Sequence, residues 1–339
     1  MKKVLVAMSG GVDSSVAAVV LARQGYEVSG ATMLLSGNEE DARDAKLTCD
    51  KLGIRHFTLD LKDKFNELVK LPFSESYLNG ETPNPCVTCN KYIKFGLFLD
   101  FALEHGFDLI ATGHYVKRGE VNGVPVIQCA DDIKKDQSYV LWQLSEFQIA
   151  HAVFPLSGME KPEVRRIAEE MDLVSAHKSD SQDICFVPDG NYAGFITEST
   201  GVKSIPGNFV DANCNILGKH SGIINYTVGQ RKGLGIAFGE PRYVLSKNVS
   251  ENTVVLGSNE ELFKKTVILR EVNLSSAFDL EGKFGVKIRY AHAASPASLE
   301  LCADGCLKVE FDEPQRAPAP GQSAVIYRDG YLVGGGIIK

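Results

Sequence analysis

The stretch SGGVDSS, residues 9–15, has the composition of a phosphate-binding turn. Gly10 and Gly11 let the backbone turn tightly and place no side chain in the way of an anion. An apolar run precedes the stretch over 3–8, and apolar residues at helical spacing follow over 16–23. N–H groups at the start of that helix would point at the anion. We expect a phosphate cradle; the alternative is a glycine-rich turn without a ligand.

The stretch is not a Walker loop, because the lysine that ends the pattern GxxxxGK[ST] is missing. It resembles instead the PP-loop of ATP pyrophosphatases, which bind the pyrophosphate part of ATP and release it after adenylating a substrate. The resemblance implies ATP as a substrate. It does not identify the group that is adenylated.

Cysteines provide the second candidate chemistry. Cys86 and Cys89 lie in TPNPCVTCN, directly before an expected helix, and a helix N-terminus lowers the pKa of a nearby thiol. Lys91 and Lys94 would add to that effect. A CxxC pair alone fits a metal clip, a redox pair or chance, and Cys185 alone is typical of a buried apolar cysteine.

The elements that position these residues alternate between strand and helix. We expect strands at 27–34, 54–59 and 107–112, and helices at 39–52, 60–71 (stopped by Pro72) and 90–105. This order predicts a parallel sheet with helices on both faces. The segments SGGVDSS and ATGHY (111–115) both follow strands, so they are expected to meet at the carboxyl edge of the sheet.

The later part of the chain changes character. A hairpin is expected over 115–129 with Asn122 and Gly123 at its turn, followed by helices at 137–144, 146–152 and 161–172. After about residue 195, short runs rich in glycine and β-branched residues predict strands. We therefore expect an α/β domain over 1–195, a small mixed or β domain over 196–260, and a closed or sandwiched β domain over 261–339.

Composition restricts the class of protein. The 339 residues are 44% hydrophobic and 23% charged, and the net charge of −7 argues mildly against a dedicated nucleic-acid binder without excluding one. No apolar run is long enough to span a membrane, and the first 30 residues lack the pattern of a signal peptide. Eight cysteines in such a chain are expected to be mostly free thiols, as in a cytoplasmic protein.

Taken together, SGGVDSS, TPNPCVTCN, ATGHY, KDQSYVLW, SDSQDICF, GQRKGLG and PGQSAVIY resemble the MnmA (TrmU) family of tRNA-uridine 2-sulfurtransferases. The resemblance implies a PP-loop domain of the adenine nucleotide α-hydrolase type, a small central domain and a C-terminal β-barrel. It also implies an activity: ATP adenylates the wobble uridine of tRNAs for lysine, glutamate and glutamine. A cysteine persulfide then delivers sulfur that comes from a cysteine desulfurase or a sulfur-carrier protein.

The resemblance also assigns residues by motif. Cys185 matches the cysteine that carries the persulfide, and Cys89 matches the nucleophile that forms a disulfide with it. Asp13 would help to hold Mg²⁺ near the pyrophosphate. The positions that match the ATP site are Ala7, Met8, Ser9, Gly10, Gly11, Val12, Asp13, Ser14, Met33 and Gly113. The positions that match contacts with the target base and the tRNA are Asn84, Pro85, Cys86, His114, Lys135, Asp136, Gln137, Arg289, Tyr290 and Gln322.

Cys86 departs from the family pattern, since many members have aspartate there. Its role is therefore open. Cys86, Cys89 and Cys185 could instead hold an iron–sulfur cluster with one open iron, although the sequence shows no certain metal site. Two other functions stay open on the residues alone. One is a different adenylating PP-loop enzyme, such as an amidotransferase synthetase, and the other is a non-enzymatic RNA-binding protein with a relic ATP site.

Overall fold

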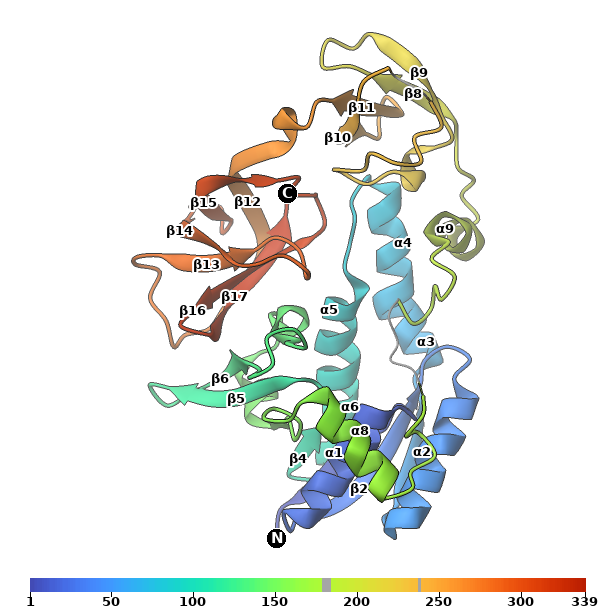
Figure 1. Cartoon of the computed structure of the whole chain (residues 1–339), viewed down its shortest axis with the longest axis vertical. Coiled ribbons are helices and arrows are strands. Elements are labelled where there is room, and N and C mark those ends of the chain that lie inside the picture. The colour runs from blue at the N-terminus through green and yellow to red at the C-terminus, as the bar shows by residue number, and fades with distance from the viewer. Residues whose placement is uncertain (179–183, 237–238) are drawn as a thin grey trace.

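The computed structural model describes residues 1–178, 184–236 and 239–339 and contains an α/β part and two β parts (Figure 1). The α/β part holds a five-stranded parallel sheet in the order β3-β2-β1-β4-β7. Its strands are β1 (Lys3–Ala7), β2 (Glu27–Leu34), β3 (His56–Asp60), β4 (Leu109–Ala111) and β7 (Ala152–Val153). The strand order reverses at β1, which confirms the expected α/β fold and places the switch point between β1 and β4.

Helices cover both faces of this sheet. Successive residues of β1 point to opposite sides, so they pack into two different cores. Val4 and Val6 pack in one core with the helices α1 (Val12–Arg23), α2 (Glu39–Leu52) and α8 (Lys161–Glu170). Leu5 packs in a second core with the helical segments between β3 and β4. The apolar run over 3–8 therefore reads as a strand buried on both faces.

The first of those segments is α3 (Lys62–Phe65), η1 (Asn66–Lys70) and α4 (Leu71–Leu78). The expectation that Pro72 stops this helix is wrong, because Pro72 lies at the start of α4 and the helix runs on. The turn before it, η1, is a wider π-helix. A widened turn relieves the clash between a proline ring and the preceding carbonyls, so the chain stays helical.

The second segment is α5 (Pro85–Cys89), η2 (Asn90–Leu97) and α6 (Phe98–Glu104). The helix expected from residue 90 thus begins at Pro85 and includes both cysteines of the CxxC pair. The Asn84 side chain caps it by accepting a hydrogen bond of 3.1 Å from the Cys86 N–H. Figure 1 shows α4 and α5 extending from the parallel sheet toward the β domains.

The expected hairpin is present as β5 (Val116–Val121) and β6 (Val124–Cys129), with positive φ at Asn122 and Gly123. The expected helix over 137–144 is shorter, a 3₁₀ turn η3 (Ser138–Leu141). Helix α7 (Glu146–Ala150) ends earlier than expected, because the next residues join the parallel sheet as β7.

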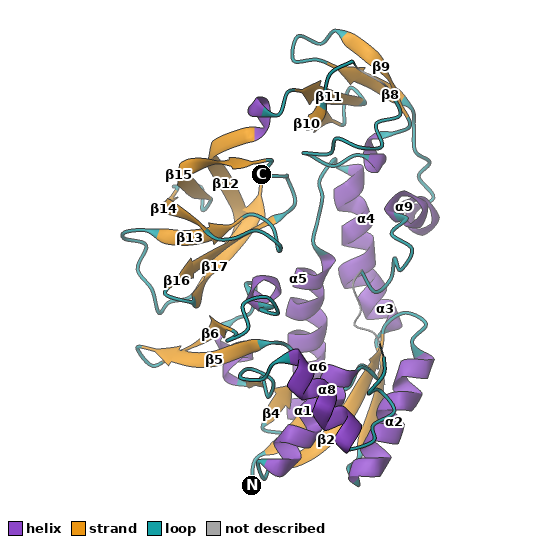
Figure 2. Ribbon diagram, viewed as in Figure 1, coloured by secondary structure: helices purple, strands orange, loops and turns teal. Residues whose placement is uncertain are grey.

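The later part of the chain consists mainly of strands, as Figure 2 shows. Helix α9 (Tyr192–Thr200) leads to a mixed four-stranded sheet in the order β10-β11-β8-β9. Its elements are β8 (Gly207–Val210), β9 (Ile216–His220), η4 (Ile223–Asn225), β10 (Tyr243–Asn248), β11 (Thr253–Gly257) and η5 (Glu260–Leu262).

A six-stranded β-barrel ends the chain, as expected, and it is closed by pairing between its first and last strands. The strands are β12 (Phe263–Leu274), β13 (Phe284–Lys287), β14 (Ser295–Leu301), β15 (Leu307–Arg316), β16 (Ser323–Arg328) and β17 (Tyr331–Ile338). The β5–β6 hairpin extends the same sheet, since β6 pairs with β17 at Gln128 and Tyr331. Among the described residues, no helix is both long and apolar enough to cross a membrane.

The two-sided burial of β1 predicts a strong effect of truncating its core. Leu5→Ala should lower the free energy of unfolding by about 2–5 kcal/mol, because it leaves a cavity under the sheet. The matched variant Leu47→Ala, at a side chain 53% exposed on α2, should change it by less than about 0.5 kcal/mol. Urea unfolding followed by circular dichroism measures both, and equal shifts for the two variants would contradict the assignment of the core.

Candidate active site

The glycine turn after β1 approaches α2 closely. Gly10 has φ +71°, and a Cβ placed on it would lie 2.5 Å from the backbone oxygen of Asp41. Ser14 braces the turn from inside, since its Oγ accepts from the Ser9 N–H at 3.1 Å and donates to the Gly11 carbonyl at 3.1 Å. Gly11 caps α1 without a side-chain hydrogen bond. The first N–H groups of α1 are therefore available to an external acceptor such as phosphate.

The segment after β4 packs directly on this turn, as expected for two loops at the carboxyl edge of the sheet. A Cβ on Gly113 would lie 3.0 Å from the carbonyl carbon of Asp13. The Tyr115 hydroxyl donates to Asp13 Oδ1 at 2.7 Å. Met33 lies near the end of the neighbouring strand β2, where it is buried. The predicted ATP residues thus lie on adjacent strand ends.

Asp13 is bound by a lysine that sequence reasoning missed. The Lys161 Nζ donates to both carboxylate oxygens of Asp13 at 2.7 and 2.8 Å, and the Lys161 side chain is only 11% exposed. A Mg²⁺ ion at Asp13 would therefore share that carboxylate with the Lys161 ammonium group. The sequence held no signal for the pair, because nothing local distinguishes Lys161 from any lysine at a helix start.

The cysteines act on one another electrostatically. Cys86 and Cys185 are exposed in part, whereas Cys89 is 8% exposed. Burial among protein atoms raises the pKa of all three thiols, in the case of Cys89 to about 12, and the charges of Cys185 and Cys86 add to the rise at Cys89. The expected lowering by the helix N-terminus is therefore wrong for this state of the protein, because desolvation outweighs the helix dipole.

Lys94 opposes this rise at each of the three thiols. Its positive charge lowers the pKa of Cys86, Cys89 and Cys185, against the larger effect of burial. Burial, and after it the same charge, brings the pKa of His114 well below its usual range, so this imidazole is neutral at pH 7. The Lys94 ammonium is thus the cation that these four groups share.

The described residues do not group the three thiols as ligands of an iron–sulfur cluster. Within residues 1–178, 184–236 and 239–339, no group of three His, Cys, Asp or Glu side chains is arranged to hold a metal ion. Asp180 and Asp183, which belong to the SDSQDICF motif, lie outside the described residues.

Several side chains expected to contact tRNA make hydrogen bonds within the protein. His114 Nδ1 shares a hydrogen bond of 2.8 Å with the Thr112 hydroxyl, and Gln137 Oε1 accepts from the Tyr115 N–H at 2.9 Å. The buried Asp136 carboxylate accepts from the Ala130 N–H and the Ser138 hydroxyl. Lys135 is half-buried in the same segment. These side chains shape the segment 135–138 from within.

Two of the residues expected to contact tRNA, Arg289 and Tyr290, lie in the barrel at its junction with the other domains. Arg289 Nη2 donates to the carbonyls of Val228 and Ala317, so it joins the central domain to the barrel. Tyr290 is 47% exposed, and its hydroxyl donates to the Asp136 carbonyl at 3.2 Å. The charge of Cys86 contributes, after burial and Asp136, to a raised pKa of Tyr290. Of these side chains, Tyr290 combines an exposed ring with electrostatic contact to a cysteine.

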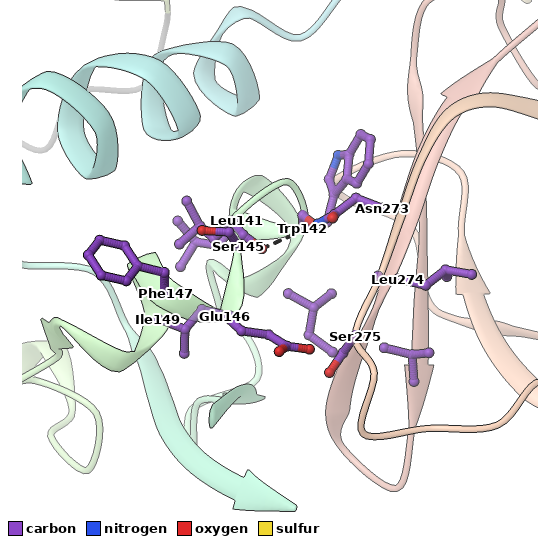
Figure 3. A pocket seen from close by; sticks show the side chains of 13 residues that line it. Leu141, Trp142, Ser145, Glu146, Phe147, Ile149, Asn273, Leu274 and Ser275 are labelled. Carbon is purple, nitrogen blue, oxygen red and sulfur yellow. Dashed lines mark hydrogen bonds between the residues drawn. The ribbon is translucent and has the colours of Figure 1, made fainter. Parts of the chain in front are cut away.

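A separate cavity of about 370 Å³ lies between the segment 141–149 and the barrel (Figure 3). Asn273 bridges the two sides at its edge by donating to the carbonyls of Trp142 and Leu144. None of the residues expected to bind ATP, the base or the tRNA lines it. The cavity therefore lies at an interface between domains and is distinct from the candidate site.

Comparisons with known proteins cover the whole chain. Family models match residues 2–189 (tRNA methyl transferase HUP domain), 193–258 (tRNA methyl transferase PRC-barrel domain) and 264–338 (aminomethyltransferase beta-barrel domain). A tRNA-specific 2-thiouridylase MnmA of Clostridioides difficile is 45% identical, over 100% of this chain and 98% of that protein. The MnmA of Treponema denticola is 46% identical, over 99% and 98%.

A third relative, MnmA 1 of Clostridium tetani, is 45% identical over 100% of this chain and 97% of its own length. The length over which these relatives match spans the glycine turn, the CxxC helix and the barrel together. The expected family is thereby confirmed. The chain belongs to the MnmA family of tRNA-specific 2-thiouridylases, which are sulfurtransferases.

Proposed function

We propose that this protein uses ATP to replace the C2 oxygen of a tRNA wobble uridine with sulfur. The proposal rests on one observation. The same α/β part contains a turn suited to phosphate and three thiols whose charges affect one another's pKa values. Full-length relatives are named tRNA-specific 2-thiouridylases, which agrees with a uridine as the acceptor. We keep the domain division at 1–195, 196–260 and 261–339 as part of the proposal.

The first step activates the base. The uridine O2 attacks the α-phosphorus of ATP, the bond to the bridging oxygen breaks, and pyrophosphate leaves, so that an O-adenylated uridine remains. The α1 N-terminus and the turn at Gly10 and Gly11 suit the pyrophosphate, because N–H groups and the helix dipole favour negative charge there. Asp13 and Lys161 lie at the same helix start. Mg²⁺, when bound there, would neutralise phosphate charge.

The second step delivers sulfur. In the route we propose, Cys185 carries a persulfide received from a cysteine desulfurase or a carrier protein. The Cys89 thiolate attacks the inner sulfur of Cys185, which forms a Cys89–Cys185 disulfide and releases hydrosulfide. Hydrosulfide then adds to C2 of the adenylated base and AMP leaves. An external dithiol reduces the disulfide and restores both thiols.

Binding of the target has to favour the thiolate before sulfur transfer can occur. The raised pKa values keep the thiols protonated at neutral pH, and the attack needs a thiolate. Lys94 is the group that favours the thiolate at each cysteine. Asn84, Pro85 and Cys86 form the start of α5, next to the coupled thiols, and are proposed to meet the flipped base. Tyr290 offers an exposed ring for stacking.

The glycine turn gives the first test. In Gly10→Ala the new Cβ meets the Asp41 backbone at a positive φ, so the turn has to shift and ATP affinity should fall at least about tenfold. Gly25→Ala is the matched control, since Gly25 has φ +84° with no atom within 4 Å of its Cβ position. Equilibrium binding of a fluorescent ATP analogue measures both, and equal affinity in the two variants would contradict the cradle.

The charge of Lys94 gives the second test. Lys94→Gln removes a cation that lowers the pKa of the Cys86 thiol, so the pKa rises and alkylation by iodoacetamide shifts to higher pH. Thiolation should need higher pH in the same variant. Lys91→Gln, on the same helix and beside Tyr92, is the control. Mass spectrometry of Cys86 alkylation against pH provides the measurement, and unshifted profiles would remove Lys94 from the mechanism.

The full reaction gives the third test. Unmodified tRNA, ATP, Mg²⁺, cysteine and a cysteine desulfurase are incubated with the protein, and tRNA mass is followed together with pyrophosphate. We expect one oxygen-to-sulfur exchange per tRNA, lost in Cys89→Ser and Cys185→Ser and retained in Cys214→Ser, whose thiol is exposed in the central domain. Full activity without Cys185 would favour another adenylating PP-loop enzyme, and tRNA binding without pyrophosphate release would favour a binding protein.

A further inference from the structure

Adjacent residues of the barrel hold two separate segments of the α/β part. Gln322 Nε2 donates to the Thr82 carbonyl at 2.6 Å, and the Thr82 N–H donates to the Pro320 carbonyl at 2.8 Å. The next residue, Ser323, accepts from Trp142 Nε1 through its hydroxyl and from the Tyr139 hydroxyl through its carbonyl. The start of β16 therefore connects the segment before the CxxC helix to the segment that follows the expected tRNA contacts 135–137.

An ion pair strengthens the first of these contacts. Arg270 Nη2, on β12, lies 2.8 Å from both carboxylate oxygens of Glu81. The Arg270 side chain is 32% exposed and that of Glu81 is 25% exposed. Partial burial leaves less water to compete than at a fully exposed pair, so the pair resists separation better than a surface ion pair.

The approach of the two backbones is close. Gly321 has φ +87°, and a Cβ on it would lie 2.7 Å from the Cβ of Glu81 and 2.8 Å from the Thr82 nitrogen. Only glycine fits such a contact without a shift. The barrel turn over 320–322 and the segment 81–82 thus form a fitted junction, which we call the barrel clamp: Glu81, Thr82, Arg270, Gly321 and Gln322.

The position of the clamp is passed on to Cys86 through a stiff segment. Pro83 follows the clamp with a fixed φ, Asn84 caps α5 through its side chain, and Pro85 starts the helix. Cys86 comes next. Because few torsion angles between Thr82 and Cys86 are free to change, a displacement at the clamp moves the helix start and the thiol with it.

We propose that Arg270 is a positioning residue of sulfur transfer, acting through Glu81 to hold the start of α5 against the barrel. This inference rests on the proposed function for its role in catalysis, but the clamp itself is testable without it. It gives the barrel a task in the chemistry beyond contact with tRNA. It also gives the Gln322 amide an intramolecular partner, where the sequence predicted a tRNA contact.

The test compares Arg270→Gln with Arg328→Gln. Arg328 lies on the same barrel, is 23% exposed and pairs with Asp279 at 2.9 Å, away from the clamp. In Arg270→Gln, kcat for thiolation should fall about tenfold while the Kd values for ATP and tRNA stay unchanged, since misplaced groups slow chemistry more than binding. Alkylation of Cys89, which is 8% exposed on the same helix, should become faster, because a released segment opens more often. Arg328→Gln should match the wild type in all of these.

A charge exchange separates positioning from simple loss of stability. The double variant Glu81→Arg/Arg270→Glu should recover part of kcat and of the slow alkylation of Cys89, whereas each single reversal should not. Recovery is partial because Arg270 Nη1 also lies 3.1 Å from Glu271, and that carboxylate would repel a glutamate at 270. Glu81→Gln provides a second single variant on the loop side, for the case that the barrel strand tolerates no change at Arg270. Thermal melting shows which variants are folded.

The outcomes decide the two proposals separately. If the wild type makes no thiouridine, the proposed function fails, and Cys89 alkylation still reports on the clamp. If Arg270→Gln equals Arg328→Gln in both kcat and alkylation, the clamp has no positioning role. A fall in tRNA affinity with unchanged kcat would also overturn it, because it would make this junction a binding surface only.

Discussion

The contact between two loop backbones at the reversal of strand order is the constraint on which the site depends. The turn after β1 leaves no room for a Cβ at Gly10, and the segment after β4 meets Asp13 at Gly113. Small residues at both places let the strand ends approach until the α1 N-terminus becomes the floor of the site. The Asp13–Lys161 pair adds a third element, α8, to the same point. The candidate phosphate site therefore lies where three segments distant in the chain converge.

The three thiols differ from the glycine turn, because their surroundings oppose the form that reacts. Burial disfavours the charged form of all three, and only the field of Lys94 works consistently against it. Such an arrangement favours the protonated thiol over the thiolate, and the thiolate is the reactive species. In the proposed route, the bound substrate would raise the reactivity of the thiols by changing their environment.

Sequence reasoning located the elements, and the two loops that meet at Asp13, because those signals are local. The apolar run of β1, the Asn122-Gly123 turn and the CxxC spacing each show within a few residues of sequence. It failed at Pro72, where a π-turn absorbs the ring, and in the thiol pKa values, where burial outweighs the helix dipole. It could not find Lys161 or Arg270. Each acts through a partner more than 100 residues away, and no local pattern records which distant carboxylate a cation will meet.

The pairing of β6 with β17 makes the barrel and the α/β part depend on each other during synthesis. The β5–β6 hairpin leaves the ribosome long before β17, so the outer edge of β6 has no partner strand until the last residues of the chain arrive. An open strand edge is a template for pairing with other chains. A truncated protein that ends before the barrel would keep that edge exposed permanently and would be prone to aggregate. The C-terminal barrel is thus also the cover that keeps the first half of the chain from self-association.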